Sequence, residues 1–193
     1  GDHFIVNFIQ DKRFAQDVLS KSDDYYRKIA ENFGFSRYSN FWTWENRARI
    51  FIYPDRSSYI ETTGQPEWSD GVADYKNKQI STYNGNEKFS VTILPHEIAH
   101  LIFRDFVGFK GDIPTWLDEG VAQSADEEDY AKAKRKAGEL YEKSSLINLN
   151  DLTSIDIKEK AKFTSVFDIH MKDNDPGILI LNPEQMLMVY YVE

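Results

Sequence analysis

The sequence predicts an α+β fold in which a small mixed sheet packs against two central helices. Strand patterns fill the first part of the chain, a long apolar helix follows at residues 90–107, and a second helix begins soon after it. An order of strands followed by the two central helices favours an α+β fold. We expect one domain over residues 1–193.

Three parts make up this expected domain. Residues 1–86 supply the sheet and its first helices, residues 90–144 a pair of helices, and residues 145–193 an irregular segment, a hairpin and the start of a last helix. The final residues are apolar and helical in character, and they stop without a cap or a breaker. We therefore expect the natural chain to continue, and the C-terminal part of the domain to be missing here.

The N-terminal elements follow from their periodicity. Residues 47–53 alternate and are rich in β-forming side chains, which predicts a strand. Residues 11–33 carry an apolar stripe at helical spacing that is interrupted near Ser22. Residues 64–71 hold the Gly, Pro and Asp typical of a loop. The remaining expected elements are strands at residues 3–8, 72–75 and 79–83, and a short helix that ends at Thr63.

The two central helices have recognisable starts. Ser90 or Thr92 can cap the first helix, and Pro95 is tolerable because it falls in the first turn, where a missing N–H bonds nothing. The second helix, expected over residues 112–144, has Pro114 in its first turn. Both helices are long enough to position side chains for chemistry.

The amino-acid composition excludes some classes of binding partner and some kinds of metal site. The 193 residues are 41% hydrophobic and 15% aromatic, which is enough for a real core. A net charge of −9 excludes a nucleic-acid partner, and no apolar run approaches the ~20 residues of a membrane span. The absence of cysteine excludes disulfides and thiolate zinc sites, so any zinc must be held by histidines and carboxylates.

The run His96-Glu97-Ile98-Ala99-His100 places reactive groups on the first central helix. Positions i and i+4 lie one turn apart on one face, so the two imidazoles can reach one metal ion. Glu97 points about 100° round the helix axis, too far to be a ligand with them but near enough to hold a metal-bound water. Two polar residues on a core helix are the ordinary alternative, but burying them without partners is costly.

A tetrahedral catalytic zinc site needs a third protein ligand and leaves its fourth place to water. Glu119 stands 19 positions after His100, in the second helix. A turn at residues 108–112 lets this helix fold back beside the first, so that Glu119 can face the histidine pair. We predict Zn2+ held by His96, His100 and Glu119.

The two motifs together resemble the gluzincin clan of zinc metallopeptidases. HEIAH followed by the Glu of WLDEGVA is most similar to the peptidase-MA-like family, which is related to thermolysin and the zinc aminopeptidases. Residues 41–55 and 63–71 resemble the N-terminal sheet and loop of that family more weakly, and residues 145–182 match none of it. The resemblance implies a zincin-like fold.

The resemblance also implies zinc-dependent hydrolysis of a peptide or protein substrate. Glu97 takes a proton from the attacking water as general base, while zinc activates that water and polarises the scissile carbonyl. The strand at residues 79–83 is expected to pair with an extended peptide. The family points to a bacterial, extracytoplasmic enzyme, and the sequence leaves the oligomeric state open.

Two departures limit what the resemblance carries over. The zinc aminopeptidases have a G-x-M-E-N loop, but Glu45-Asn46 lacks the Gly and the Met, so an endopeptidase is the better expectation. Thermolysin-like enzymes have an Asp four positions after the third ligand, where this chain has Gln123. Either Asp118 or Gln123 is a candidate to orient a ligand histidine.

Tyr191 is a further catalytic candidate from the resemblance. Related enzymes stabilise the oxyanion with a Tyr followed by a variable and then a long polar residue, and Tyr191-Val192-Glu193 fits that pattern. Tyr190 is the alternative, and packing in an amphipathic helix is the ordinary explanation for both. Two other functions stay open: a zincin-like binding domain without turnover, and a zinc amidase acting on a non-protein substrate.

Overall fold

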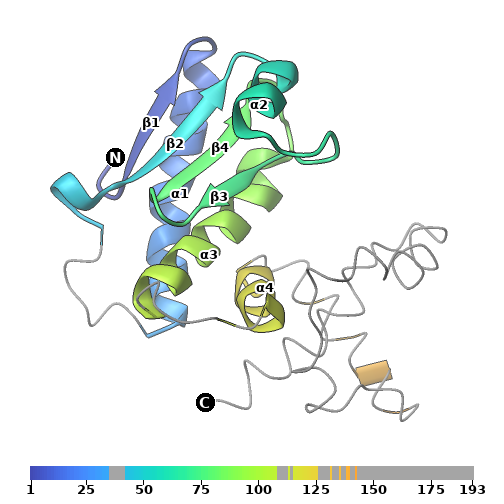
Figure 1. Ribbon diagram of the computed structural model, residues 1–193. Helices are drawn as coiled ribbons and strands as arrows, with labels where there is room; N and C mark the ends of the chain where they lie inside the picture. Colours follow the sequence, from blue (N-terminus) through green and yellow to red (C-terminus); the bar gives the residue numbers. More distant parts are fainter. Residues whose placement is uncertain are drawn as a thin grey trace. The chain divides into compact units, whose positions relative to one another are not determined.

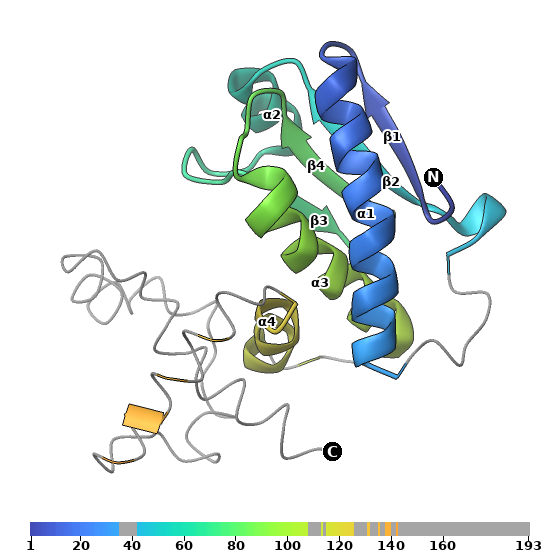
Figure 2. The ribbon, with the colours of Figure 1, turned by 180° about the vertical axis from the view of Figure 1, so that it is seen from behind.

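The fold is α+β, with a small mixed sheet of four strands and helices on both of its faces (Figures 1 and 2). The computed structural model describes residues 1–34, 42–107, 113 and 115–125, with isolated helical positions between 131 and 142. Backbone contacts group the chain into two compact units, residues 1–110 and 111–193. Each unit is described by itself.

The sheet lies in the first unit and has the strand order β1-β2-β4-β3. Strands β1, β2 and β4 run parallel, and β3 is antiparallel to β4. Alternate residues of each strand turn towards α1 and α3, which cover one face (Figure 2). The strands span Phe4–Phe8 (β1), Ala48–Tyr53 (β2), Val72–Asp74 (β3) and Gln79–Tyr83 (β4). All four expected strands are confirmed.

One expectation about the sheet is wrong. Strand β4 was to pair with an extended peptide, but it lies inside the sheet, between β2 and β3. Ile80 is aligned with Ile50 on one side and with Ala73 on the other, so both edges of β4 already carry ladder hydrogen bonds. Within the described residues, β3 has a strand neighbour on one side only. The open edge near the candidate site is therefore β3.

Helix α1 (Lys12–Asn32) packs on the sheet as one continuous helix. The side chain of Asp11 caps it by accepting the backbone N–H groups of Arg13 and Phe14, both at 3.0 Å. The expected helix is confirmed, and the polar Ser22 that interrupts its apolar stripe does not break it. The Ser22 hydroxyl is buried and donates to the Val18 carbonyl at 2.6 Å, so the polar side chain is satisfied within the helix.

Two shorter elements complete the N-terminal part. Helix α2 (Arg56–Thr63) is capped by Asp55 and ends at Gly64, which has a left-handed φ of 68°. Helix α2 packs on the sheet face opposite α1 (Figure 1), where the Tyr59 ring contacts the sheet. A 3₁₀ turn, η2 (Trp44–Asn46), precedes β2.

The helix with the HEIAH motif begins differently from the expectation. A π-helical turn, η3 (Phe89–Ile93), leads directly into α3 (Leu94–Val107). Ser90 and Thr92 therefore lie inside the helical run and cap nothing, and the Ser90 hydroxyl instead accepts from Lys21 Nζ at 3.1 Å. Pro95 does fall in the first turn of α3, as expected.

At the junction of η3 and α3, a side chain replaces a backbone hydrogen bond that Pro95 cannot make. In the π-helical turn the Leu94 N–H donates to the Phe89 carbonyl five residues back. The same pattern would give the Ser90 carbonyl the N–H of Pro95, which proline lacks. The Tyr25 hydroxyl of α1 donates to the Ser90 carbonyl at 3.2 Å instead. A side chain from α1 thus completes the start of α3.

The second unit contains α4 (Thr115–Gln123). The expected helix over residues 112–144 is shorter than predicted, because α4 ends at Gln123 in a turn. There the Ser124 hydroxyl donates to the Val121 carbonyl at 2.7 Å and competes with helical continuation. Pro114 and residues 143–193 lie outside the described residues, so the hairpin and the last helix stay predictions. No helix in the described part of the chain is long and apolar enough to cross a membrane.

We predict that Tyr25→Phe lowers the free energy of unfolding by about 1 kcal/mol, because the Ser90 carbonyl loses its donor. The loss should be smaller in a Pro95→Ala background, where residue 95 regains an N–H for that carbonyl. Urea unfolding of the four proteins of this double-mutant cycle measures the coupling, expected at about 0.5 kcal/mol or more. Equal losses in both backgrounds would show that the hydroxyl does not replace the missing N–H.

Candidate metal centre

Helix α3 fixes the directions of His96, Glu97 and His100 by burying an apolar face. His100 is only 3% exposed, and His96 and Glu97 are half-buried. The apolar residues around them are buried against α1 and the sheet, which sets the rotation of the helix. These residues are Leu94, Pro95, Ile98, Ala99, Leu101 and Ile102.

The two imidazoles meet at their Nε2 atoms. The His96 and His100 Nε2 atoms are 3.1 Å apart, the ring centroids are 4.6 Å apart, and the ring planes lie at 86°. Two nitrogens bound to one tetrahedral zinc at about 2.0–2.1 Å would stand about 3.3–3.4 Å apart. The pair therefore has the spacing and the convergence that a shared zinc ion requires.

Tyr75, which follows β3, borders the histidine pair. Its ring lies 6.0 Å from the His100 ring in an edge-on arrangement, and the Arg104 guanidinium lies 5.0 Å from the centre of the Tyr75 ring. The end of β3 is thus placed beside the second histidine. Sequence reasoning missed Tyr75, because an aromatic residue before a hairpin turn looks the same whether it borders a site or only packs.

Glu97 acts electrostatically on Tyr59. Burial raises the pKa of Tyr59 above its usual value, and the negative charge of Glu97 raises that pKa further. The Glu97 carboxylate therefore lies within electrostatic reach of Tyr59 in α2. The role of Glu97 as a base beside the metal stays a prediction.

The remaining predicted site residues lie in or beyond α4. Glu119 belongs to α4 as expected, but its side chain lies outside the described residues. Asp118 and Gln123 are buried, at 2% and 8% exposure, and their role in orienting a histidine stays a prediction. Tyr190 and Tyr191 lie outside the described residues. Among the described side chains no group of three His, Asp or Glu forms a metal site, so the structure brings together two of the three predicted ligands.

His3 has the ordinary structural role expected of a histidine at the start of a strand. Its Nδ1 lies 2.9 Å from the Trp42 carbonyl oxygen, and its ring stacks on Tyr26 at 3.9 Å. Trp42 is fully buried, and its indole N–H donates to Asp105 at 2.7 Å. These residues form part of the core and provide a control for the histidines of α3.

A cavity of about 460 Å³ lies elsewhere on the first unit. Its walls include Tyr53, Thr63, Gln79 and Ser81, and Gln79 Nε2 donates to Ser81 Oγ at 3.1 Å. These strand residues alternate with the core-facing ones, so the cavity opens on the sheet face opposite α3. Neither histidine of α3 lines it, but β3 and Tyr75 do, so the cavity adjoins the strand that borders the candidate metal centre.

Comparison with known proteins gives no match to a family model, a curated protein or a solved structure. The candidate metal centre is therefore supported by the geometry of the α3 side chains and by the sequence motifs.

We predict that His100→Ala abolishes zinc binding, because one remaining imidazole cannot hold the ion. His3→Gln serves as the control, since it removes a histidine that packs in the core. Elemental analysis of the purified proteins should find one zinc per chain in the parent and in His3→Gln, and almost none in His100→Ala. Equal zinc in the parent and His100→Ala would exclude the assignment.

Proposed function

We propose that the chain is a zinc-dependent peptidase of zincin-like fold that cleaves within peptide chains. One observation supports this above all others: the Nε2 atoms of His96 and His100 converge at 3.1 Å on a helix that also presents Glu97. A core helix has no structural need for three such side chains in one turn, because their burial is costly.

His96, His100 and Glu119 would hold the zinc. When bound, zinc lowers the pKa of a coordinated water towards ~7 and polarises the scissile carbonyl. The Glu97 carboxylate takes the proton of the attacking water and delivers it to the leaving amine. Tyr191, or Tyr190 if the register differs by one residue, donates a hydrogen bond to the oxyanion.

The open edge of β3 supports an extended peptide as substrate. Gly71 precedes β3 and lies close to Ile93. A Cβ atom added to Gly71 would come within 2.6 Å of Ile93 Cγ2. Tyr75 follows β3 and contacts His100. Strand β3 thus runs along α3 from the start of the helix to the second histidine. A peptide added to its open edge by main-chain hydrogen bonds would pass the histidine pair.

Two features distinguish this proposal from its alternatives: the candidate general base Glu97 and the open edge of β3. A binding domain without turnover has no use for a general base, and Glu97 is present and half-buried beside the histidines. A zinc amidase acting on a non-protein substrate would use the same residues but would not need the open strand edge. A substrate screen that includes peptides and non-peptide amides distinguishes the two.

We predict that Glu97→Gln keeps the fold and the zinc but loses peptide hydrolysis by about 10²–10⁴-fold, because an amide cannot accept the proton of water. Glu87→Gln is the matched control, since Glu87 is exposed and precedes the helical run of η3 and α3. Turnover of a mixed peptide library, measured with zinc content, checks both variants.

Either of two results would contradict the proposal. Zinc-loaded parent protein that hydrolyses no peptide would favour a binding domain or an amidase. Hydrolysis by Glu97→Gln at the rate of the parent would show that another group is the base.

A further inference from the structure

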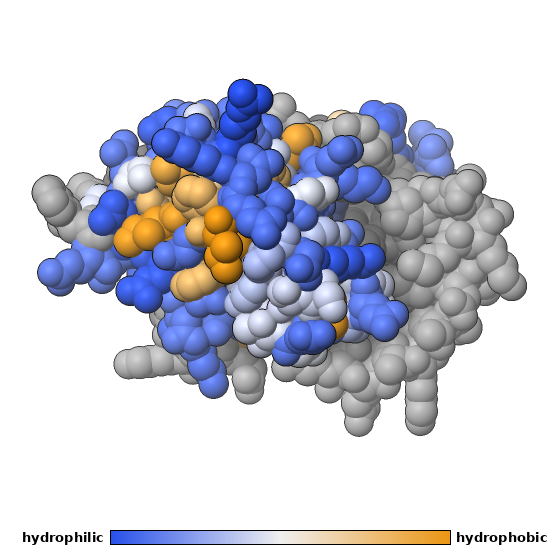
Figure 3. All heavy atoms as spheres, turned by 90° about the horizontal axis from the view of Figure 1, so that it is seen from above, coloured by the Kyte–Doolittle hydropathy of each residue, from blue (hydrophilic) through white to orange (hydrophobic). Residues whose placement is uncertain are grey.

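Trp68 is the most exposed large hydrophobic residue in the described part of the chain. Its side chain is 81% exposed, in the loop that joins α2 to β3. Trp42, in contrast, is fully buried. The upper face of the molecule also shows a group of hydrophobic residues among hydrophilic ones (Figure 3), but nothing indicates what covers that group. Trp68 differs from that group because hydrogen bonds hold the backbone of its loop in place.

Hydrogen bonds fix the loop on both sides of the indole. The Tyr59 hydroxyl, buried in α2, lies 2.7 Å from the Ser69 hydroxyl. The Ser69 N–H donates to the Pro66 carbonyl at 2.9 Å, and its hydroxyl donates to the Gly71 carbonyl at 3.2 Å. Ser69 is 5% exposed, so the residue next to the exposed Trp68 is anchored in the interior.

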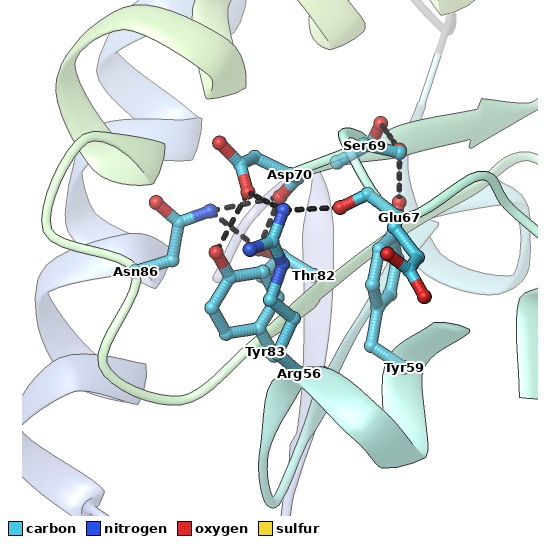
Figure 4. A network of polar contacts seen from close by, with 9 residues as sticks. Arg56, Tyr59, Glu67, Ser69, Asp70, Thr82, Tyr83 and Asn86 are labelled. Atoms are coloured by element: carbon cyan, nitrogen blue, oxygen red, sulfur yellow. Dashed lines mark hydrogen bonds and ion pairs between the residues drawn. The ribbon is translucent and has the colours of Figure 1, made fainter. Parts of the chain in front are cut away.

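Asp70 adds a second anchor, shown in Figure 4. Its carbonyl accepts from the Thr82 hydroxyl at 3.0 Å and from Asn86 Nδ2 at 2.8 Å. Its carboxylate accepts from the Tyr83 hydroxyl at 2.7 Å and pairs with Arg56 at 3.4 Å.

Arg56 also donates to the Glu67 carbonyl, on the other side of Trp68. The backbone that carries the indole is therefore held in place before any ligand arrives. A side chain on such a backbone loses less conformational entropy on binding than one on an unanchored loop.

The loop ends where the open edge of β3 begins. Gly71 contacts Ile93 at the start of the α3 run, and Tyr75 contacts His100 about four residues along. At ~3.3 Å per strand residue these ends are about 13 Å apart. Trp68 therefore lies beyond the end of β3 that is farther from His100.

We propose that Trp68 determines substrate specificity by packing on a large apolar side chain of the peptide, three or four residues from the bond that is cut. This inference rests on the proposed peptidase function. A peptide along β3 leaves the histidine pair and reaches the loop, where the indole offers a fixed apolar surface. Tryptophan is enriched among the residues that dominate binding energy, because it buries a large area with few rotatable bonds.

The test compares cleavage of peptide series in which one large apolar residue is moved along an otherwise polar sequence. For peptides with that residue three or four positions from the cut, Trp68→Ala should raise KM about tenfold with little change in kcat. Trp68→Phe should restore most of the affinity. Ile9→Ala is the matched control, because Ile9 is 75% exposed and follows β1, at the opposite edge of the sheet. It should leave every KM unchanged.

Direct binding provides a second readout that does not need turnover. In the Glu97→Gln background, a fluorescently labelled peptide of the preferred series should bind about tenfold more weakly when Trp68→Ala is added. A parent that cleaves peptides while Trp68→Ala shows the same positional preference and affinity would overturn the inference and leave the peptidase function intact. A zinc-loaded parent that neither binds nor cleaves any peptide would overturn both.

Discussion

The burial of α3 is the constraint on which the rest of the site depends. Ile98, Leu101 and Ile102 are fully buried, so the helix cannot rotate without exposing them. That fixed rotation brings the two imidazoles together at their Nε2 atoms. The start of the helix is fixed as well. Pro95 has no N–H to donate to the Ser90 carbonyl, and the Tyr25 hydroxyl donates to that carbonyl instead.

Strand β3 connects the site to the rest of the first unit. It is short, Val72–Asp74, yet its flanking residues make specific contacts with α3: Gly71 with Ile93, and Tyr75 with His100. The anchored loop before β3 ends at Gly71, so the hydrogen bonds of Ser69 and Asp70 also help to position the strand. The open edge of β3, the α3 histidine next to it and the loop that carries Trp68 are therefore linked by one continuous set of contacts.

The sequence was most informative where the spacing of neighbouring residues determines which way their side chains point. The i, i+4 spacing of His96 and His100 predicted their convergence, and alternation predicted all four strands. Sequence did not predict that β4 is internal, because alternation does not reveal which strands are neighbours. It placed the start of the α3 run within one residue, but it did not predict that the run begins with a π-helical turn, and it overestimated the length of α4. The placement of Glu119 depends on the packing of distant segments, which no local pattern encodes.

The central claim is that His96, His100 and Glu119 share one zinc ion. Anomalous diffraction at the zinc edge, from crystals of the protein prepared with zinc, tests this most directly. We expect one anomalous peak per chain, within about 2.0–2.2 Å of both Nε2 atoms and of a Glu119 carboxylate oxygen. A peak that lacks any one of these three ligands, or no peak in protein prepared with zinc, would contradict the claim.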